Sequence, residues 1–297
     1  MKRQHLYIIF SLLLLQGFVK NNTMYSSIKK NTISGITITD SLPKISNIGY
    51  DAPASYAGYK LVWSDEFNGS SLDTLNWSYQ NGDGCPNNCG WGNNELEYYT
   101  SNRSNLFFQD GKMIIQAKKE SANGKEYSSA KIISRGKKYF KFGRIDLRAK
   151  APKGKGIWPA FWMMPEKDIY GGWPKSGEVD IMEMIGHEAN KNHGTLHFGP
   201  GPGSVQLGGN YTLPSGIFND EFHVFSLEWK KDEMRWFVDG KLFSTHTISE
   251  FGSNHYPFNE DFYLIINLAV GGNWPGNPDN TTDMPQSLIV DYVRVYQ

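Results

Sequence analysis

The sequence lacks several patterns that would identify other classes of protein. Its formal net charge is zero, and no basic run is longer than Lys137-Lys138, which argues against nucleic acid or an anionic membrane as a partner. It has no long helical periodicity, no internal repeat, and no Rossmann or P-loop glycine pattern. These absences exclude a mainly helical, a repeat or a nucleotide-binding architecture.

Cysteine is almost absent, because Cys85 and Cys89 are the only two in the chain. No histidine lies near them to complete a zinc site. We expect a small disulfide that closes this loop, since an oxidising compartment would favour it over free thiols or a metal site. Such a bond would stiffen one loop and would not hold the fold together.

The N-terminal apolar run is too short to cross a membrane. Residues 6–15 supply about ten apolar positions, whereas a spanning helix needs about twenty. Because the basic residues Lys2 and Arg3 precede this run, residues 1–22 are predicted to be an export signal, cut between about 17 and 25. Residues 23–57 are expected to be a disordered linker. The protein is therefore expected to be secreted, periplasmic or at the cell surface, without membrane insertion after cleavage.

The remaining chain, residues 58–297, is predicted to form one all-β domain. Asp110-Gly111 and Asp239-Gly240 are typical of tight hairpin turns. Short alternating segments between such turns predict antiparallel strands packed as a two-sheet sandwich. The predicted strands are residues 60–63, 112–117, 143–149, 222–229, 234–238, 262–268 and 287–295.

Three carboxylates, Glu178, Asp180 and Glu183, stand among apolar residues that prefer β-structure. Glycines bracket the segment, which favours a short strand. On a helix, the side chains of 178 and 183 would point about 140° apart. On a regular strand, 178 and 180 share a face but 183 does not. We therefore predict a β-bulge around Ile181 or Met182 that returns Glu183 to the same face.

This spacing suits chemistry at a sugar. The backbones of Glu178 and Glu183 would lie roughly 13 Å apart, and their carboxyl groups could approach to about 5–5.5 Å, as double displacement at an anomeric carbon requires. Asp180, between them, could hold a proton or hydrogen-bond a neighbour and keep their pKa values apart. The alternative is a solvated acidic face on an edge strand, although three like charges on one face repel one another.

Aromatic residues are abundant, at 14% of the chain with nine tryptophans, and several surround these carboxylates. In a strand, Trp158 and Trp162 share a face, so they either line a groove or pack in the core. Trp173 lies on a Gly/Pro loop before Glu178, which favours a ligand contact. Further candidates are Thr195 and His197 in the next segment, Trp274 near the C-terminus, and Asn93, Asn94 and Glu95.

Seven stretches of the chain carry a resemblance to a known family. They are residues 63–67, 90–100, 156–164, 177–186, 194–197, 267–276 and 291–297. Together they resemble family 16 of the glycoside hydrolases, and within it the laminarinase-type endo-1,3-β-glucanases, over about residues 60–297. The E-x-D-x-x-E spacing resembles the bulged branch of the family rather than the lichenase-like E-x-D-x-E branch.

The resemblance implies a β-jelly-roll sandwich of two antiparallel sheets with an open substrate cleft on the concave sheet. It implies that Glu178 is the nucleophile, Asp180 the assisting carboxylate and Glu183 the acid/base, with no cofactor needed for catalysis. The substrate contacts implied by position are Asn93, Trp158, Trp173, His197 and Trp274.

A structural calcium ion on the convex side is frequent in this family. By position its ligands would be Glu66, Gly111 and Asp291, mostly through backbone oxygens, which suit a hard cation. The chain departs from the family pattern at Lys131, where relatives usually carry Arg. A subsite contact from that Arg is therefore in doubt.

The expected function is that of a secreted, retaining endo-β-1,3-glucanase that acts as a monomer on laminarin-like or mixed 1,3/1,4 chains. A galactan hydrolase of the agarase or carrageenase type is one alternative, but no Arg/Lys cluster flanks the carboxylates. A non-catalytic β-glucan-recognition protein is another. Such relatives lose one or both glutamates, whereas this chain keeps both.

Overall fold

The computed structural model describes residues 31–33, 36–38 and 43–297. The chain divides into two compact units, Met1–Lys44 and Ile45–Gln297. In the first unit, β1 (Asn31–Ile33) pairs antiparallel with β2 (Ile36–Ile38). The expected export signal at 1–22 lies outside the described residues. Within the described ranges, no helix is long and apolar enough to cross a membrane.

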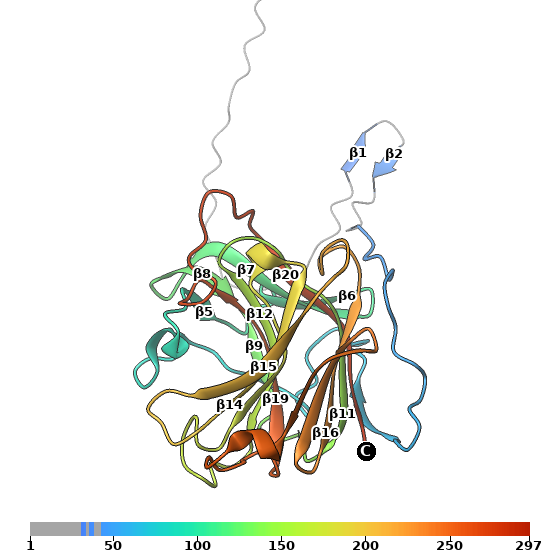
Figure 1. Ribbon diagram of the computed structural model, residues 1–297. Coiled ribbons are helices and arrows are strands. Elements are labelled where there is room, and N and C mark those ends of the chain that lie inside the picture. The colour runs from blue at the N-terminus through green and yellow to red at the C-terminus, as the bar shows by residue number, and fades with distance from the viewer. Residues whose placement is uncertain (1–30, 34–35, 39–42) are drawn as a thin grey trace, which may run out of the picture. The chain divides into compact units, whose positions relative to one another are not determined.

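Two sheets build the second unit (Figure 1). Sheet I has eight strands in the order β15-β14-β13-β12-β19-β9-β4, with β10 paired to β19. Its strands are β4 (Ser78–Tyr79), β9 (Lys131–Ile133), β10 (Tyr139–Phe140), β12 (Ile157–Pro165), β13 (Glu178–Glu183), β14 (Lys191–Phe198), β15 (Val205–Thr212) and β19 (Phe262–Val270).

Sheet II has ten strands in the order β18-β17-β16-β11-β20-β7-β8-β5, with β3 paired to β20 and β6 to β7. Its strands are β3 (Leu61–Asp65), β5 (Glu97–Tyr99), β6 (Leu106–Gln109), β7 (Lys112–Ala122), β8 (Lys125–Ser129), β11 (Gly143–Lys150), β16 (His223–Lys230), β17 (Glu233–Val238), β18 (Lys241–Thr247) and β20 (Gln286–Tyr296). Short 3-10 helices lie between strands at Cys89–Gly92, Gly186–Glu188 and Ile248–Phe251.

The sheets are antiparallel except where β5 pairs parallel with β8, and they form the predicted β-jelly-roll sandwich. All seven predicted strand segments overlap strands of the structure, namely β3, β7, β11, β16, β17, β19 and β20, and two of them begin one residue earlier than the strand. The two predicted turns are also confirmed. Asp110 and Gly111, like Asp239 and Gly240, have the positive φ angles that a type I′ turn requires.

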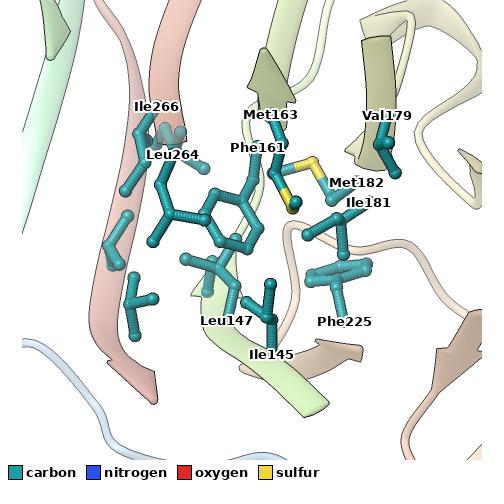
Figure 2. Packing of buried hydrophobic residues seen from close by; sticks show 14 of the residues in the cluster. Ile145, Leu147, Phe161, Met163, Val179, Ile181, Met182, Phe225, Leu264 and Ile266 are labelled. Carbon is teal, nitrogen blue, oxygen red and sulfur yellow. The ribbon is translucent and has the colours of Figure 1, made fainter. Parts of the chain in front are cut away.

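The core lies between the two sheets (Figure 2). Ile145 and Leu147 of β11 point from sheet II toward Phe161 of β12 and toward Leu264 and Ile266 of β19 in sheet I. All five side chains are buried, and burial of each contributes about 1.5–3 kcal/mol. Alternation along each strand therefore leaves every second side chain of sheet I free for its other face.

The predicted β-bulge is present in β13. Opposite β14, Asp180 pairs with Thr195 and Glu183 with His193, so three steps on β13 match two on β14. Opposite β12 the same extra residue appears between the partners of Phe161 and Trp162. Ile181 and Met182, the two residues inside the bulge, are both fully buried. The bulge thus turns two successive side chains into the core and returns Glu183 to the outer face of sheet I.

The compact unit begins at Ile45, whereas the sequence predicted a domain boundary at 58 and a linker before it. Contacts with Arg148 attach the residues before 58 to the second unit. Its buried guanidinium donates hydrogen bonds to the backbone oxygens of Tyr50, at 2.7 Å, and Asn47, at 3.0 Å. Tyr56 donates from its hydroxyl to Asp146 at 2.7 Å. Residues 45–57 therefore pack on sheet II as a strap; the earlier part of the predicted linker falls mostly outside the described residues.

Candidate active site

A cleft of about 830 Å³ lies on the outer face of sheet I. Strands β12, β13, β14, β15 and β19 supply its floor, and the loops before β5, before β13 and after β19 supply its walls. The structure brings together in this one cleft the three predicted catalytic carboxylates and the five side chains that the resemblance implied as substrate contacts. These are Asn93, Trp158, Trp173, Glu178, Asp180, Glu183, His197 and Trp274. Asn94, a further candidate from the sequence, is not among the lining residues, and its Nδ2 donates to Asn273 Oδ1 at 2.8 Å.

Each of the two glutamates is held by one tryptophan. The indole Nε1 of Trp173 donates to Glu178 Oε2 at 2.8 Å, and the indole Nε1 of Trp158 donates to Glu183 Oε1 at 2.9 Å. Glu183 is further fixed by its backbone N–H, which donates to Asn192 Oδ1 at 3.2 Å. Each carboxyl group therefore keeps one oxygen that its tryptophan does not occupy, and both groups are oriented before any ligand enters.

Asp180 lies between the glutamates and is almost fully buried, with 3% of its surface exposed. His197 Nε2 lies 3.0 Å from Asp180 Oδ2 and 3.8 Å from Glu178 Oε1. The other ring nitrogen, Nδ1, lies 3.1 Å from Ser204 Oγ. Below the strand, Trp236 Nε1 donates to the backbone oxygen of Asp180 at 2.7 Å. The imidazole and this buried indole thus fix the centre of the carboxylate row.

Burial raises the pKa of all three carboxyl groups. Burial and then the charge of Asp180 raise the pKa of Glu178 to about 7, and nearby donors and cations oppose the rise. Burial raises the pKa of Asp180 to about 8. Burial, reinforced by the neighbouring carboxylates, raises the pKa of Glu183 well above its usual value. Glu178 is therefore the group that most readily carries a negative charge, and Glu183 is suited to keep its proton.

One part of the cleft contains the buried cation Lys131. Its Nζ lies 4.2 Å from the ring centroid of Trp91 and 4.9 Å from that of Trp162, within the range of cation–π attraction. Trp162 therefore lines the cleft. The sequence had left open whether it lines a groove or packs in the core. Burial lowers the pKa of Lys131, and Glu95 and other carboxylates oppose that shift.

A chain of hydrogen bonds runs beneath this part of the cleft. Trp162 Nε1 donates to Asn267 Oδ1 at 2.7 Å, and Asn267 Nδ2 donates to the Tyr99 hydroxyl at 3.0 Å. That hydroxyl donates to Glu95 Oε2 at 3.2 Å, and Asn93 Nδ2 lies 3.4 Å from Glu95 Oε1. Asn93 and Glu95, proposed from the sequence as sugar contacts, thus belong to one network that also orients Trp162.

Another wall of the cleft is aromatic. Trp274, with 39% of its surface exposed, packs edge-on against Trp158, at 5.7 Å between ring centroids, and against His193, at 5.1 Å. Sequence reasoning missed His193, although its spacing of four from His197 on a strand places both on one face. The other lining residues that it did not select as sugar contacts include Asn88, Trp91, Ser204, Gln206 and Asn267.

Cys85 and Cys89 form a disulfide. The loop that they close leads into the wall of the cleft, because Asn88 and Trp91 both line it. Within the loop, Asn88 donates from its backbone to Gly84 at 2.8 Å. The disulfide therefore lies beside the cleft and away from the core between the sheets.

The side chains proposed for a calcium ion are occupied by protein cations. Asp291 Oδ1 lies 3.0 Å from Lys112 Nζ, and Asp291 Oδ2 lies 2.6 Å from Arg148 Nη1. Glu66 accepts two hydrogen bonds from Arg294, at 2.8 and 2.9 Å. A calcium ion beside Asp291 would face two positive charges at short range. The carboxylates of Glu66 and Asp291 are therefore engaged by ion pairs. A calcium ion held mostly by backbone oxygens, with Gly111 among its ligands, stays a prediction.

Comparisons with known proteins agree with this geometry. Residues 93–293 match the family described as "Glycosyl hydrolases family 16". The chain is 43% identical over 270 residues to glucan endo-1,3-β-glucosidase A1 of Niallia circulans, which covers 84% of this chain and 40% of that protein. It is 41% identical over 264 residues to a β-glucanase of Rhodothermus marinus, which covers 85% of this chain and 90% of that one.

Among solved structures, the laminarinase catalytic domain of Thermotoga maritima is similar, with a TM-score of 0.75 and 44% identity. The match covers 80% of this chain and 98% of that domain. The present chain thus spans less than half of one relative and nearly the whole of two others. With a family match over more than half of its length, and with these identities, the chain belongs to family 16 of the glycosyl hydrolases.

Proposed function

We propose that the protein is an endo-β-1,3-glucanase that hydrolyses internal bonds of laminarin-like β-glucans with retention of anomeric configuration. The observation that carries this proposal is the row of Glu178, Asp180 and Glu183 on the floor of one open cleft, with each glutamate oriented by an indole. The activities in the names of the relatives, endo-1,3-β-glucosidase, β-glucanase and laminarinase, support the same substrate class.

In the first step, a Glu178 carboxylate oxygen attacks the anomeric carbon. The bond from that carbon to the glycosidic oxygen breaks, and Glu183 gives its proton to the departing oxygen. The raised pKa of Glu183 keeps this proton available near neutral pH. The bulge that brings both glutamates to one face supports the short carboxyl separation of a retaining site, which leaves no room for a water molecule between them.

In the second step, Glu183 is a carboxylate and removes a proton from a water molecule. The water oxygen attacks the same carbon, and Glu178 leaves as a carboxylate. Asp180 supports both steps, because its buried carboxyl group adjoins the nucleophile and contacts His197. Burial raises the pKa of Asp180 to about 8, above the value of about 7 for Glu178, so Asp180 can hold a proton while Glu178 carries the charge.

The lining of the cleft favours a neutral polysaccharide. Among the described residues that line it, Lys131 is the only lysine, no arginine is present, and the carboxylates of Glu95 and Glu178 adjoin that lysine. A sulfated galactan would therefore meet more negative than positive charge. The exposed indoles of Trp173 and Trp274 offer apolar faces that suit glucose rings.

The setting of the enzyme is also proposed. Export to the medium, periplasm or cell surface is supported by the basic and apolar pattern at the N-terminus. Action as a monomer is supported by the three carboxylates and the indoles that orient the two glutamates, which are all supplied by a single chain. At the carboxylate of Asp291, we propose that Lys112 and Arg148 supply the positive charge in place of a calcium ion.

Proton NMR of the earliest products from laminarin tests the proposal. The first new reducing end should be the β-anomer, and Glu178→Gln and Glu183→Gln should each release almost no product. Glu188→Gln, which changes a half-exposed glutamate paired with Lys191 outside the cleft, serves as the matched control and should remain active. An α-anomer appearing first would contradict the retaining mechanism, and failure of the wild-type protein to shorten laminarin would contradict the proposed substrate.

A further inference from the structure

Glu178, Asp180 and His197 each place one possible ligand atom in the same part of the cleft. A carboxylate oxygen from each acidic residue and one ring nitrogen of the histidine all lie within 4.8 Å of one another. We propose that these three side chains bind a divalent transition-metal ion such as Zn²⁺ and that the bound ion inhibits the enzyme. The binding itself is independent of the proposed hydrolytic function.

The separations of these atoms fit a tetrahedral ion. Ligands at about 2.0–2.2 Å from zinc lie about 3.4 Å from one another. His197 Nε2 lies 3.0 Å from Asp180 Oδ2 and 3.8 Å from Glu178 Oε1, so the two distances bracket that value. The two carboxylate oxygens lie within 4.8 Å of each other, so a shift of at most about 1.4 Å would bring them to the same spacing. The open cleft leaves a fourth position for water.

Asp180 supplies an independent sign of a ligand site. Its Oδ2 atom is buried and has no hydrogen-bond partner in the structure, although His197 Nε2 is only 3.0 Å away. A buried carboxylate oxygen without a hydrogen bond is costly, and a cation shared with the imidazole would satisfy it.

Neighbouring groups prepare the remaining two ligands. Trp173 occupies Glu178 Oε2, so Glu178 Oε1, which faces the imidazole, is the oxygen that remains for a metal. On the far side of the ring, His197 Nδ1 lies 3.1 Å from Ser204 Oγ. If Nδ1–H donates to this hydroxyl, Nε2 presents its lone pair to the cleft, as metal-binding histidines usually do.

The donor set also indicates which ions bind. One imidazole nitrogen with two carboxylate oxygens suits Zn²⁺, Co²⁺ or Cu²⁺, whereas Ca²⁺ and Mg²⁺ prefer oxygen ligands in larger number. Glu183 contributes no atom to the cluster, and Trp158 occupies one of its oxygens. The two glutamates therefore differ: the ion should engage Glu178 and leave Glu183 free.

Inhibition follows if Glu178 is the nucleophile, and this part rests on the proposed function. An ion on Glu178 Oε1 withdraws the electron pair that would attack the anomeric carbon. It also occupies part of the cleft in front of Glu178 that the sugar would have to enter. Zn²⁺ and a β-1,3-glucan oligosaccharide should therefore compete for one site.

Isothermal titration with ZnCl₂ in the absence of glucan tests the binding, and the absorption spectrum of the Co²⁺ complex reports its geometry. One ion should bind per chain. Glu178→Gln and His197→Gln should each weaken binding by about tenfold or more, whereas Glu183→Gln should stay within about threefold of wild type. Thermal unfolding of each variant, followed by circular dichroism, verifies that it is folded.

His246→Gln is a second control, because His246 lies 3.0 Å from Glu250 Oε1 outside the cleft. It should bind Zn²⁺ as wild type does. Equal binding by wild type and the folded His197 variant would overturn the proposal, and so would loss of binding in the Glu183 or His246 variant. Zinc binding that an oligosaccharide fails to displace would also overturn it, even if the proposed hydrolysis is correct.

Discussion

Replacement of Glu178 by glutamine should stabilise the folded protein, and the gain should grow as the pH rises. The partly buried carboxyl group of Glu178 has a pKa raised to about 7, mainly by desolvation, from a usual value of 4.5. Folding therefore opposes its ionisation. Glutamine keeps the shape of the side chain and can still accept the hydrogen bond from Trp173, but it carries no charge at any pH.

The sign and size follow from linkage between ionisation and folding. A carboxyl group whose pKa is higher in the folded state costs nothing below its unfolded pKa, and its cost grows until the pH passes the folded pKa. For Glu178 the cost is about 1 kcal/mol at pH 5 and about 3 kcal/mol at pH 8. The difference of about 2 kcal/mol corresponds to roughly 5 °C in Tm for a domain of this size.

Thermal unfolding of wild type and Glu178→Gln at pH 5, 6, 7 and 8 measures the effect. The Tm difference between them should widen steadily toward pH 8. Glu188→Gln provides the opposite control, because the hydrogen bond from Lys191 lowers the pKa of Glu188. This solvent-accessible pair contributes at most about 1 kcal/mol to stability. Its loss should therefore slightly lower Tm at neutral pH. If the Tm difference between the Glu178 variant and wild type does not grow between pH 5 and 8, or if the variant is less stable at pH 8, folding does not raise the pKa of Glu178, and the reasoning is wrong.

Three further predictions concern other residues. Glu183→Ala should reduce kcat/KM on laminarin by about 10²–10⁴ but far less on an aryl β-glucoside whose leaving group needs no proton; equal losses would contradict its role as the acid. Trp173→Ala should weaken oligosaccharide binding by about three- to tenfold with little change in Tm, since half of this side chain is exposed. A large fall in Tm with intact binding would show that Trp173 stabilises the fold and does not contact the substrate. Chelation by EDTA should leave Tm unchanged, because Asp291 pairs with Lys112 and Arg148; a fall that calcium reverses would restore the calcium site.

The parts of the site that lie within one strand could be predicted from the sequence. Glu178, Asp180 and Glu183 belong to a single short segment, so the two-residue period of a strand was enough to require a bulge. The indoles of Trp158 and Trp173 could be assigned to the cleft for the same reason, from strand alternation and from a Gly/Pro loop. Such local rules do not specify hydrogen-bond partners, and neither indole could be assigned to its glutamate.

Long-range contacts could not be predicted. Trp162, Asn267 and Tyr99 are joined by hydrogen bonds across 105 and 168 residues of sequence, and no periodic pattern records such pairs. Arg148 binds residues 47–50 across about a hundred positions, 98 and 101 in the bonds concerned. A polar, weakly periodic segment therefore resembled a linker, although its backbone oxygens satisfy a buried cation.

The bulge in β13 has a consequence for how the gene can change. A strand without it would read Glu-x-Asp-x-Glu and, by strict alternation, would still present all three acids to the cleft. Deletion of the codon for Ile181 or Met182 would produce that pattern. Such an in-frame loss would remove one buried apolar side chain and shorten the interval between the glutamates, yet it would invert neither of them. A single-codon deletion between Glu178 and Asp180 would instead disrupt the site, because it would turn Glu178 to the opposite face of the sheet from Asp180.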